Sequence, residues 1–401
     1  MSRRFLNLVY RDYTTAPDNL LYSVTRLDAS QLFYKSAAAA TAAARKKNNG
    51  SKQAPVISSI ADIPEIRRLP APTFSFQPFR SKMYHIIKGV DVFAPLGAGA
   101  GDGGRILCAD GAGYAAAFDM ASRSMLGMPT MNAPKGPKHV AISSRTSIPR
   151  TDKHAFAADP CGDDCDSDDF ILKHVIEGDH AESLYVMDMS PGNPLPFEVL
   201  SFSSKGWIWR PLPRPPFFAD RRYKPIYDPC VAVDGTTFFV SPDAAAVEEG
   251  SAAAAAVGTY RFDTVTQEWD KAGDWALPFI GKTEHVPELG VWLGLSAQNP
   301  YHLCAISSLD PPAVRHVWSD IDPPESWYLL EHALLNLGSG RFCTAKFFDV
   351  SEDIKDDDAY ETAVVFTGVE VLRCDDASAG GLKMIKHKSK CMVDLDIISV
   401  L

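Results

Sequence analysis

A chain of 401 residues is long enough to bury a large core. Hydrophobic residues make up 46% of it and charged residues 22%, as in ordinary globular proteins, and this composition excludes a disordered or fibrous chain. The formal net charge of −10 disfavours nucleic acid or an anionic membrane as the main partner, because phosphate binding needs a concentrated basic face. The first residues lack the apolar run of a signal peptide, and no segment reaches the roughly 18 apolar residues of a membrane span.

The chain begins with two predicted strands, FLNLVYR at 5–11 and LYSVTRL at 21–27. An alanine-rich segment follows them. Residues 36–47 have the composition of a helix but continue into NNGSKQ, so we expect a short surface helix and a flexible linker, an insertion over 36–55.

A recurring β-hairpin is the most informative pattern. Residues 106–119 contain two apolar runs around Asp110-Gly111, a dipeptide that suits a type I′ turn. An aspartate that closes the second run is predicted to start the next turn, and the aromatic residue near it is predicted to lie on an inner strand and to pack between blades. The hairpin layout recurs at 170–188 around Gly178, 230–240 around Asp234-Gly235, 285–295 around Leu289-Gly290 and 334–348 around Gly338 and Gly340; the aromatic and aspartate pairs are Tyr114 with Phe118-Asp119, Tyr185 with Asp188, and Tyr260 with Phe262-Asp263.

The turns recur at intervals of roughly 50 to 70 residues, close to the period of four-stranded kelch-type blades. We therefore predict an all-β fold, a single kelch-like β-propeller domain over residues 1–401 with six blades (five to seven). Strand-like runs at 363–374 and 382–393 end the chain, and we expect 382–393 to share a blade with 5–11, which closes the ring. Another all-β fold with independent core aromatics is the alternative.

Two further insertions are predicted. Residues 145–169 form a polar acidic loop, and residues 244–257 form an alanine-rich loop. Cys161 and Cys165 lie among aspartates of the first loop, with His154 and His174 nearby. These are metal-ligand types, but the spacing fits neither a zinc site nor an EF-hand, so a solvated loop is the favoured interpretation.

The remaining motifs indicate no chemistry. Gly99-x-Gly101-x-x-Gly104 has the spacing of a dinucleotide fingerprint, but a strand follows it where that motif needs a helix, which favours a glycine-rich loop. We therefore predict no catalytic residue, no cofactor and no metal. Five of the eight cysteines lie in apolar runs, which predicts reduced core thiols and a cytoplasmic or nuclear location; they are Cys108, Cys230, Cys304, Cys343 and Cys374.

Two features could contact a partner. Arg210, Pro213 and Pro216 match an RxxPxxP ligand for aromatic grooves, although a rigid connection between blades is the favoured interpretation. Most of the seven tryptophans are predicted to pack in the core, and Trp207 and Trp327 are expected to be the most exposed. The basic run KHKSK (386–390) is predicted to be a solvated edge strand.

Several blocks of the sequence carry a family resemblance. They are MSRRFLNLVYRD, YSVTRLDASQLFY, residues 258–297, YHLCA, LNLGSGRFC and LKMIKHKSK. The chain resembles a large, grass-expanded plant family of unknown function whose members are similar to kelch-like and F-box-associated propellers. The resemblance implies the fold and carries no catalytic motif.

These observations predict a non-enzymatic intracellular scaffold, monomeric, whose loops bind an unidentified protein partner, with neither nucleic acid nor membrane as a partner. The alternative is a propeller that binds a small molecule or a carbohydrate, or an enzyme with its site at the central channel. Histidine and carboxylate side chains converging on one channel mouth, with shifted pKa values, would favour that alternative.

Overall fold

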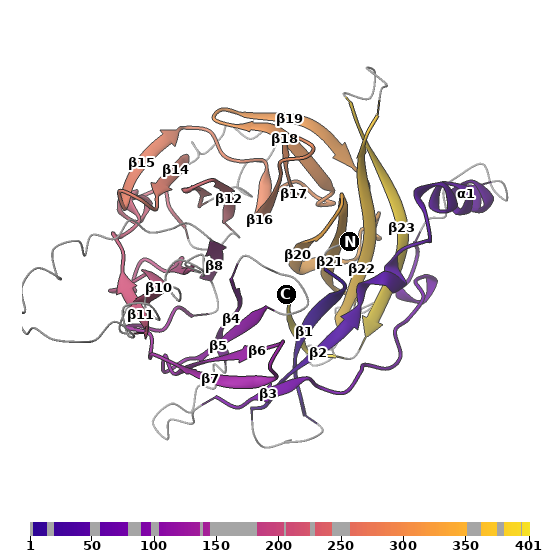
Figure 1. Ribbon diagram of the computed structural model, residues 1–401. Helices are drawn as coiled ribbons and strands as arrows, with labels where there is room; N and C mark the ends of the chain where they lie inside the picture. Colours follow the sequence, from indigo (N-terminus) through magenta and orange to yellow (C-terminus); the bar gives the residue numbers. More distant parts are fainter. Residues whose placement is uncertain are drawn as a thin grey trace, which may run out of the picture.

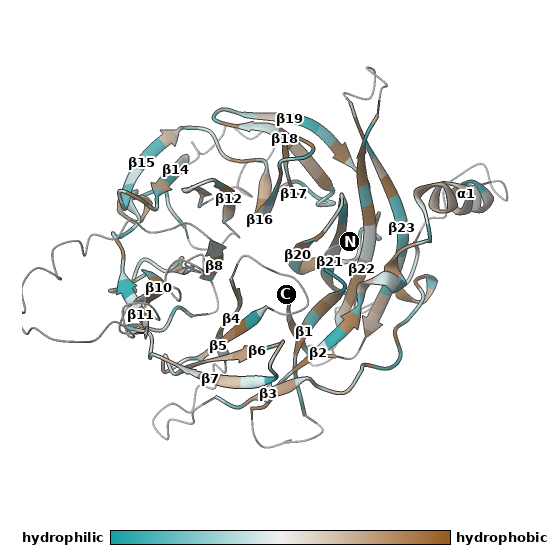
Figure 2. Cartoon of the chain, viewed as in Figure 1, coloured by the Kyte–Doolittle hydropathy of each residue, from teal (hydrophilic) through white to brown (hydrophobic). Residues whose placement is uncertain are grey.

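The fold is all-β. The computed structural model describes residues 3–13, 20–48, 57–78, 90–97, 104–136, 139–144, 183–203, 206–224, 229–242, 257–350, 362–374, 381–393 and 395–401. Within these ranges the regular structure is 24 strands, one α-helix and a few short 3₁₀ turns. Figure 1 shows the sheets arranged around a common centre. In Figure 2 the outer strand β15 (Glu268–Gly273) is largely hydrophilic, as expected at the rim, whereas the outer strand β19 (Pro312–Trp318) mixes hydrophilic and hydrophobic residues.

The first sheet joins the two ends of the chain. Its strands are β1 (Phe5–Arg11), β2 (Tyr22–Asp28), β3 (Phe74–Phe76) and β24 (Ile397–Val400), in the order β24-β1-β2-β3. Leu8 pairs with Val400 and Val9 with Ser399. The N-terminal strand therefore has a C-terminal partner, but the prediction that residues 382–393 supply it was wrong. That run is the outer strand of the last sheet, because its partner is the long hairpin strand before it.

The second and third sheets are antiparallel meanders. The second has the order β4-β5-β6-β7, and the third has the order β11-β10-β9-β8. Their strands are β4 (Val90–Leu96), β5 (Arg105–Asp110), β6 (Ala115–Asp119), β7 (Ser124–Met128), β8 (His139–Ser144), β9 (Ser183–Asp188), β10 (Phe197–Ser203) and β11 (Gly206–Pro211).

Two further meanders are joined into one eight-stranded sheet. Their first strands, β12 and β16, pair in parallel over two residue pairs only, Cys230 with Gly281 and Val231 with Lys282. The strands are β12 (Cys230–Asp234), β13 (Thr237–Ser241), β14 (Thr259–Asp263), β15, β16 (Phe279–Val286), β17 (Val291–Ser296), β18 (Leu303–Leu309) and β19. Each half has four strands.

The last sheet contains the longest strands. Its order is β20-β21-β22-β23, and its members are β20 (Tyr328–Gly338), β21 (Arg341–Asp349), β22 (Thr362–Arg373) and β23 (Leu382–Val393). The described part of the chain thus contains six four-stranded units, the first of which combines both ends of the chain.

The structure describes four of the five predicted hairpins, and their turns differ in part from the prediction. Ser339 and Gly340, with φ of 56° and 72°, form a two-residue turn in which both residues have positive φ. Gly235 is the first residue of another two-residue turn. The turn after β5 is longer than Asp110-Gly111 predicts: Asp110 ends the strand, its carboxylate accepts the Ala112 N–H at 2.9 Å, and the positive φ falls on Gly113.

The predicted aspartate turns are confirmed. The carboxylates of Asp119, Asp188 and Asp263 each accept backbone N–H groups two residues further on. The prediction for the aromatics was partly wrong. Phe118, Tyr185, Tyr260 and Phe262 are buried, whereas Tyr114 is 51% exposed in the turn before β6, and all five lie on or beside second and third strands, not innermost ones.

The meander topology defines two faces of the ring of sheets. Successive strands of a meander run in opposite directions, so the links between units and the connections between second and third strands lie on one face. We call this the linker face, and we call the opposite one, with the first and third connections, the hairpin face. Arg373, where β22 ends, donates to the Glu288 carbonyl of the β16–β17 turn at 2.7 Å, as expected for two hairpin-face connections.

The hydrophobic core lies between neighbouring sheets. One cluster packs Leu6, Leu8 and Val400 of the first sheet against Phe366 and Met392 of the last. All seven tryptophans contact such clusters, whereas core packing was predicted for only most of them. Four of the five predicted core cysteines are buried and Cys374 is only half-buried, because it follows the last residue of β22.

The segment between β2 and β3 leaves the first sheet and covers the outer strand of the last one. It contains η1 (Ala29–Leu32), α1 (Ala37–Asn48) and η2 (Ile60–Asp62), and Glu65 forms a parallel bridge with Cys391 of β23. Figure 1 shows α1 beside β23. The predicted loop at 145–169, the predicted loop at 244–257 apart from the buried Val257, and the predicted turn at Gly178 lie outside the described residues.

Candidate binding surface

The proline-rich motif forms part of the link between the third and fourth units. Arg210 is near the end of β11, and the exposed Pro213 and Pro216 follow it on the linker face. The Pro213 carbonyl accepts a hydrogen bond from the Trp269 indole at 2.9 Å, and the Leu212 N–H donates to the Phe197 carbonyl at 2.9 Å. The backbone of the motif therefore contributes to the contact between two units.

Trp207 and Trp327 lie on opposite faces and are both half-buried. Trp207 is at the hairpin-face end of β11, where its ring meets that of Phe202, 50% exposed, at 5.4 Å. Trp327 packs on Phe348 at 5.3 Å and is the last residue of the link into β20. The structure does not bring the predicted contact residues together. Gly99, Gly101 and the Cys161–Cys165 region lie outside the described residues.

The link between the fifth and sixth units, residues 319–327, is anchored by a buried ion pair. Asp320 is fully buried, and its carboxylate accepts hydrogen bonds from the Lys346 ammonium and the Thr344 hydroxyl, both at 2.8 Å. Ile321 beside it is 1% exposed and packs in the cluster that contains Phe348. Because a buried charge without its partner is costly, this arrangement fixes the position of the link.

A small apolar surface begins where that link ends. Tyr328 is 65% exposed and Leu330 is 49% exposed, both at the linker-face end of β20. The register shifts between Leu329 and Glu331, so Leu330 is an extra residue with no partner on β21. Such a bulge redirects a side chain away from the sheet. We call Tyr328 and Leu330 the β20 patch.

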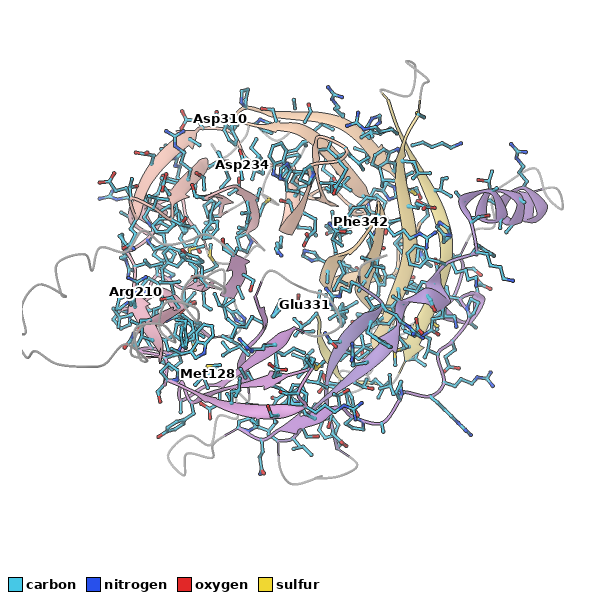
Figure 3. The ribbon with its side chains drawn as sticks, viewed as in Figure 1. Met128, Arg210, Asp234, Asp310, Glu331 and Phe342 are labelled. Carbon is cyan, nitrogen blue, oxygen red and sulfur yellow. The ribbon has the colours of Figure 1, made fainter. Side chains whose placement is uncertain are left out.

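Charged side chains line the two innermost strands beside the β20 patch. Lys282 and Glu284 of β16 form an ion pair at 3.2 Å. On β20, Figure 3 shows Glu331 at the inner margin of the ring. His332 lies against Gly281, where a Cβ atom on that residue would collide with the imidazole Nε2. Glycine at 281, with φ of +63°, thus permits the close approach of β16 and β20.

One histidine on the linker face contacts the anchored link. The His302 Nε2 lies 3.5 Å from the carboxylate of Asp322, and its Nδ1 lies 3.9 Å from that of Asp320. Burial lowers the pKa of His302 below the ordinary histidine value, while the two carboxylates oppose the shift. The imidazole is therefore neutral at pH 7.

Two buried thiols of the described residues are unreactive. Burial raises the pKa of Cys304 and Cys343 to about 12, so neither thiol is a nucleophile at neutral pH. Within the described ranges, no three histidine, cysteine or acidic side chains are grouped as metal ligands. An exposed tyrosine and leucine beside charged groups provide stacking, apolar contact and ion pairing.

Sequence reasoning missed the β20 patch. The run YLLEH was part of no predicted hairpin, and the bulge that exposes Leu330 depends on pairing with β21. The available signal was the position of Tyr328 directly after a proline-containing link, where a strand begins.

Comparison with known proteins identifies the family. The chain belongs to the family described as "Protein of unknown function (DUF1668)", whose model matches residues 3–392. A search of curated proteins finds no match. One solved chain, from the complex structure of the fission yeast SREBP-SCAP binding domains, is similar with a TM-score of 0.28 and 10% identity. The alignment covers 71% of this chain and 62% of that one, so the chain spans less than two thirds of its length.

Proposed function

We propose that this protein is a single-domain, kelch-like β-propeller of six blades, and that it acts as a non-enzymatic scaffold that binds a protein partner through its linker face. The observation that carries the proposal is the β20 patch, an exposed tyrosine and leucine at the start of a strand that follows the buried Asp320–Lys346 ion pair. Six four-stranded units around one centre support the ring, and six free cysteines among the described residues suit the cytoplasm or nucleus.

The energetics of protein interfaces favour this surface. A few aromatic and apolar side chains near the centre of an interface contribute most of the binding free energy, and tyrosine is enriched among them. The backbone of Tyr328 is held by the buried link before it and by β21 beside it. Little conformational entropy is therefore lost when a partner covers the side chain.

A ligand or substrate at the centre of the ring is the second candidate, favoured by one observation. Lys282, Glu284 and Glu331 place charges of both signs on two adjacent innermost strands, and the imidazole of His332 lies on the same strand as Glu331. The exposure of Tyr328 and Leu330 favours the scaffold, which is the proposal adopted. Among the described residues no helix has the length and hydrophobicity needed to cross a bilayer.

Site-specific photo-crosslinking in the native tissue tests the proposal. A photoreactive phenylalanine analogue at position 328 should crosslink one protein, and the same analogue at Tyr114 is the control. Tyr114 is 51% exposed and also lies on the linker face, but on the second unit. Equal crosslinking of the same proteins from both positions would show that the β20 patch is not the contact surface.

A further inference from the structure

A basic surface lies on the side of the ring, away from the β20 patch. The segment from Ala29 to Arg45 and strand β23 together contain six lysine and arginine residues and no acidic residue. The chain as a whole has a net charge of −10. Contacts join the two segments, since the Tyr34 N–H donates to His387 of β23 at 3.2 Å and Lys390 donates to Gln31 at 3.0 Å. The positive charge is therefore concentrated locally on an acidic protein.

Four lysines of this surface have no carboxylate partner among the described residues. Lys35 and Lys383 are exposed, Lys388 and Lys390 are half-buried, and none of the four forms an ion pair within the described ranges. The Lys388 ammonium lies 4.9 Å from the centre of the Tyr34 ring. We call these four lysines the basic edge.

The carboxylate beneath the basic edge is already neutralised. Glu370 of β22 accepts hydrogen bonds from Arg341 at 3.2 Å and from His387 at 3.1 Å. Because the Nδ1 of His387 accepts the Tyr34 N–H, the proton of the neutral ring lies on Nε2 and is donated to Glu370. Glu370 therefore compensates little of the positive potential of the lysines, and Glu65, which bridges Cys391 beside Lys390, is itself paired with Arg67 at 3.2 Å.

We propose that the basic edge binds an acidic segment of a partner polypeptide, a second surface distinct from the β20 patch. Charge complementarity carries the proposal, and the size of the surface selects the class of partner. At physiological salt the field of a charge decays over about 8 Å, so a short acidic segment meets mainly the local lysines. A nucleic acid extends beyond one strand and one helix, and its further phosphates would meet the acidic remainder of the protein.

Fluorescence anisotropy of the full chain with a defined probe tests the proposal. The probe is a fluorescein-labelled peptide of alternating glutamate and serine, and an oligothymidylate of equal length is the second ligand. The peptide should bind the wild type, and Lys383→Glu combined with Lys388→Glu should weaken it at least about tenfold, because opposite charges replace two of the four lysines. Arg221→Glu with Lys224→Glu, an equal charge change at two exposed linker-face residues, should have little effect.

The outcomes separate this surface from the proposed function. Removal of Tyr328 and Leu330 should leave peptide binding unchanged, so either proposal can fail alone. Lys383→Gln with Lys388→Gln repeats the test if charge reversal unfolds the chain. Equal loss of binding in both charge-reversed variants, or tighter binding of the oligothymidylate at the same site, would overturn the proposal.

Discussion

The contribution of β24 to stability can be tested with two side chains of one short strand. Ile397 and Val400 are 7% and 6% exposed and pack between the first and last sheets, whereas Ile398 between them is 36% exposed. Ile397→Ala should cost about 2–5 kcal/mol, and loss of two buried carbons at Val400 about 1.6 kcal/mol. The double alanine variant should therefore lose about 4–7 kcal/mol, a large part of the about 5–15 kcal/mol typical of a domain.

Urea unfolding of the wild type, the double variant and Ile398→Ala measures this difference. Ile398→Ala is the matched control, because it removes an exposed side chain from the same strand, and it should change the free energy of unfolding by less than about 1 kcal/mol. If the double variant has the same unfolding midpoint and slope as the control, β24 does not hold the two ends of the chain together and the reasoning is refuted.

Three further predictions concern His387, Gly281 and Lys346. Burial lowers the pKa of His387 in the folded protein below the value of about 6.5 that histidine has in the unfolded chain. The neutral ring of His387 therefore contributes stability above pH 6.5, and this contribution is lost as the pH falls below 6.5. The melting temperature should fall from pH 7.5 to pH 5, and it should fall less in His387→Gln. Gly281→Ala should lower the melting temperature more than Gly290→Ala. Both glycines have positive φ, but only at position 281 would the added Cβ atom collide with a side chain, that of His332. Equal decreases in the two variants would contradict this. Lys346→Met should cost about 3–5 kcal/mol in urea unfolding by leaving Asp320 unpaired, and a variant as stable as the wild type would show that the pair is no anchor.

Local patterns made much of the fold predictable. Asp234-Gly235 and the glycines around Ser339 indicate hairpins, because a two-residue turn between antiparallel strands needs residues that adopt positive φ. The aspartate turns at Asp119 and Asp263 are likewise local, since each carboxylate binds the backbone just after it. The all-β class follows from such signals.

The rest depends on contacts between distant segments. Nothing near Ile397 in sequence indicates that it pairs with Tyr10, and the longer run at 382–393 was the stronger strand signal. Lys346 lies in an apolar strand where only its pairing with Asp320 explains its burial. Leu330 is exposed by a bulge that forms only when β20 pairs with β21. The sequence of β20 alone therefore does not predict the β20 patch.

The affinity of the crosslinked partner for the β20 patch tests the central claim most directly. With the partner purified, calorimetry would compare the wild type, Tyr328→Ala with Leu330→Ser, and Tyr114→Ala, the exposed linker-face tyrosine on another unit. The account predicts at least about a tenfold loss of affinity for the double variant and wild-type affinity for Tyr114→Ala, because a central tyrosine contributes about 2 kcal/mol or more. Unchanged affinity of the double variant, at unchanged melting temperature, would contradict it.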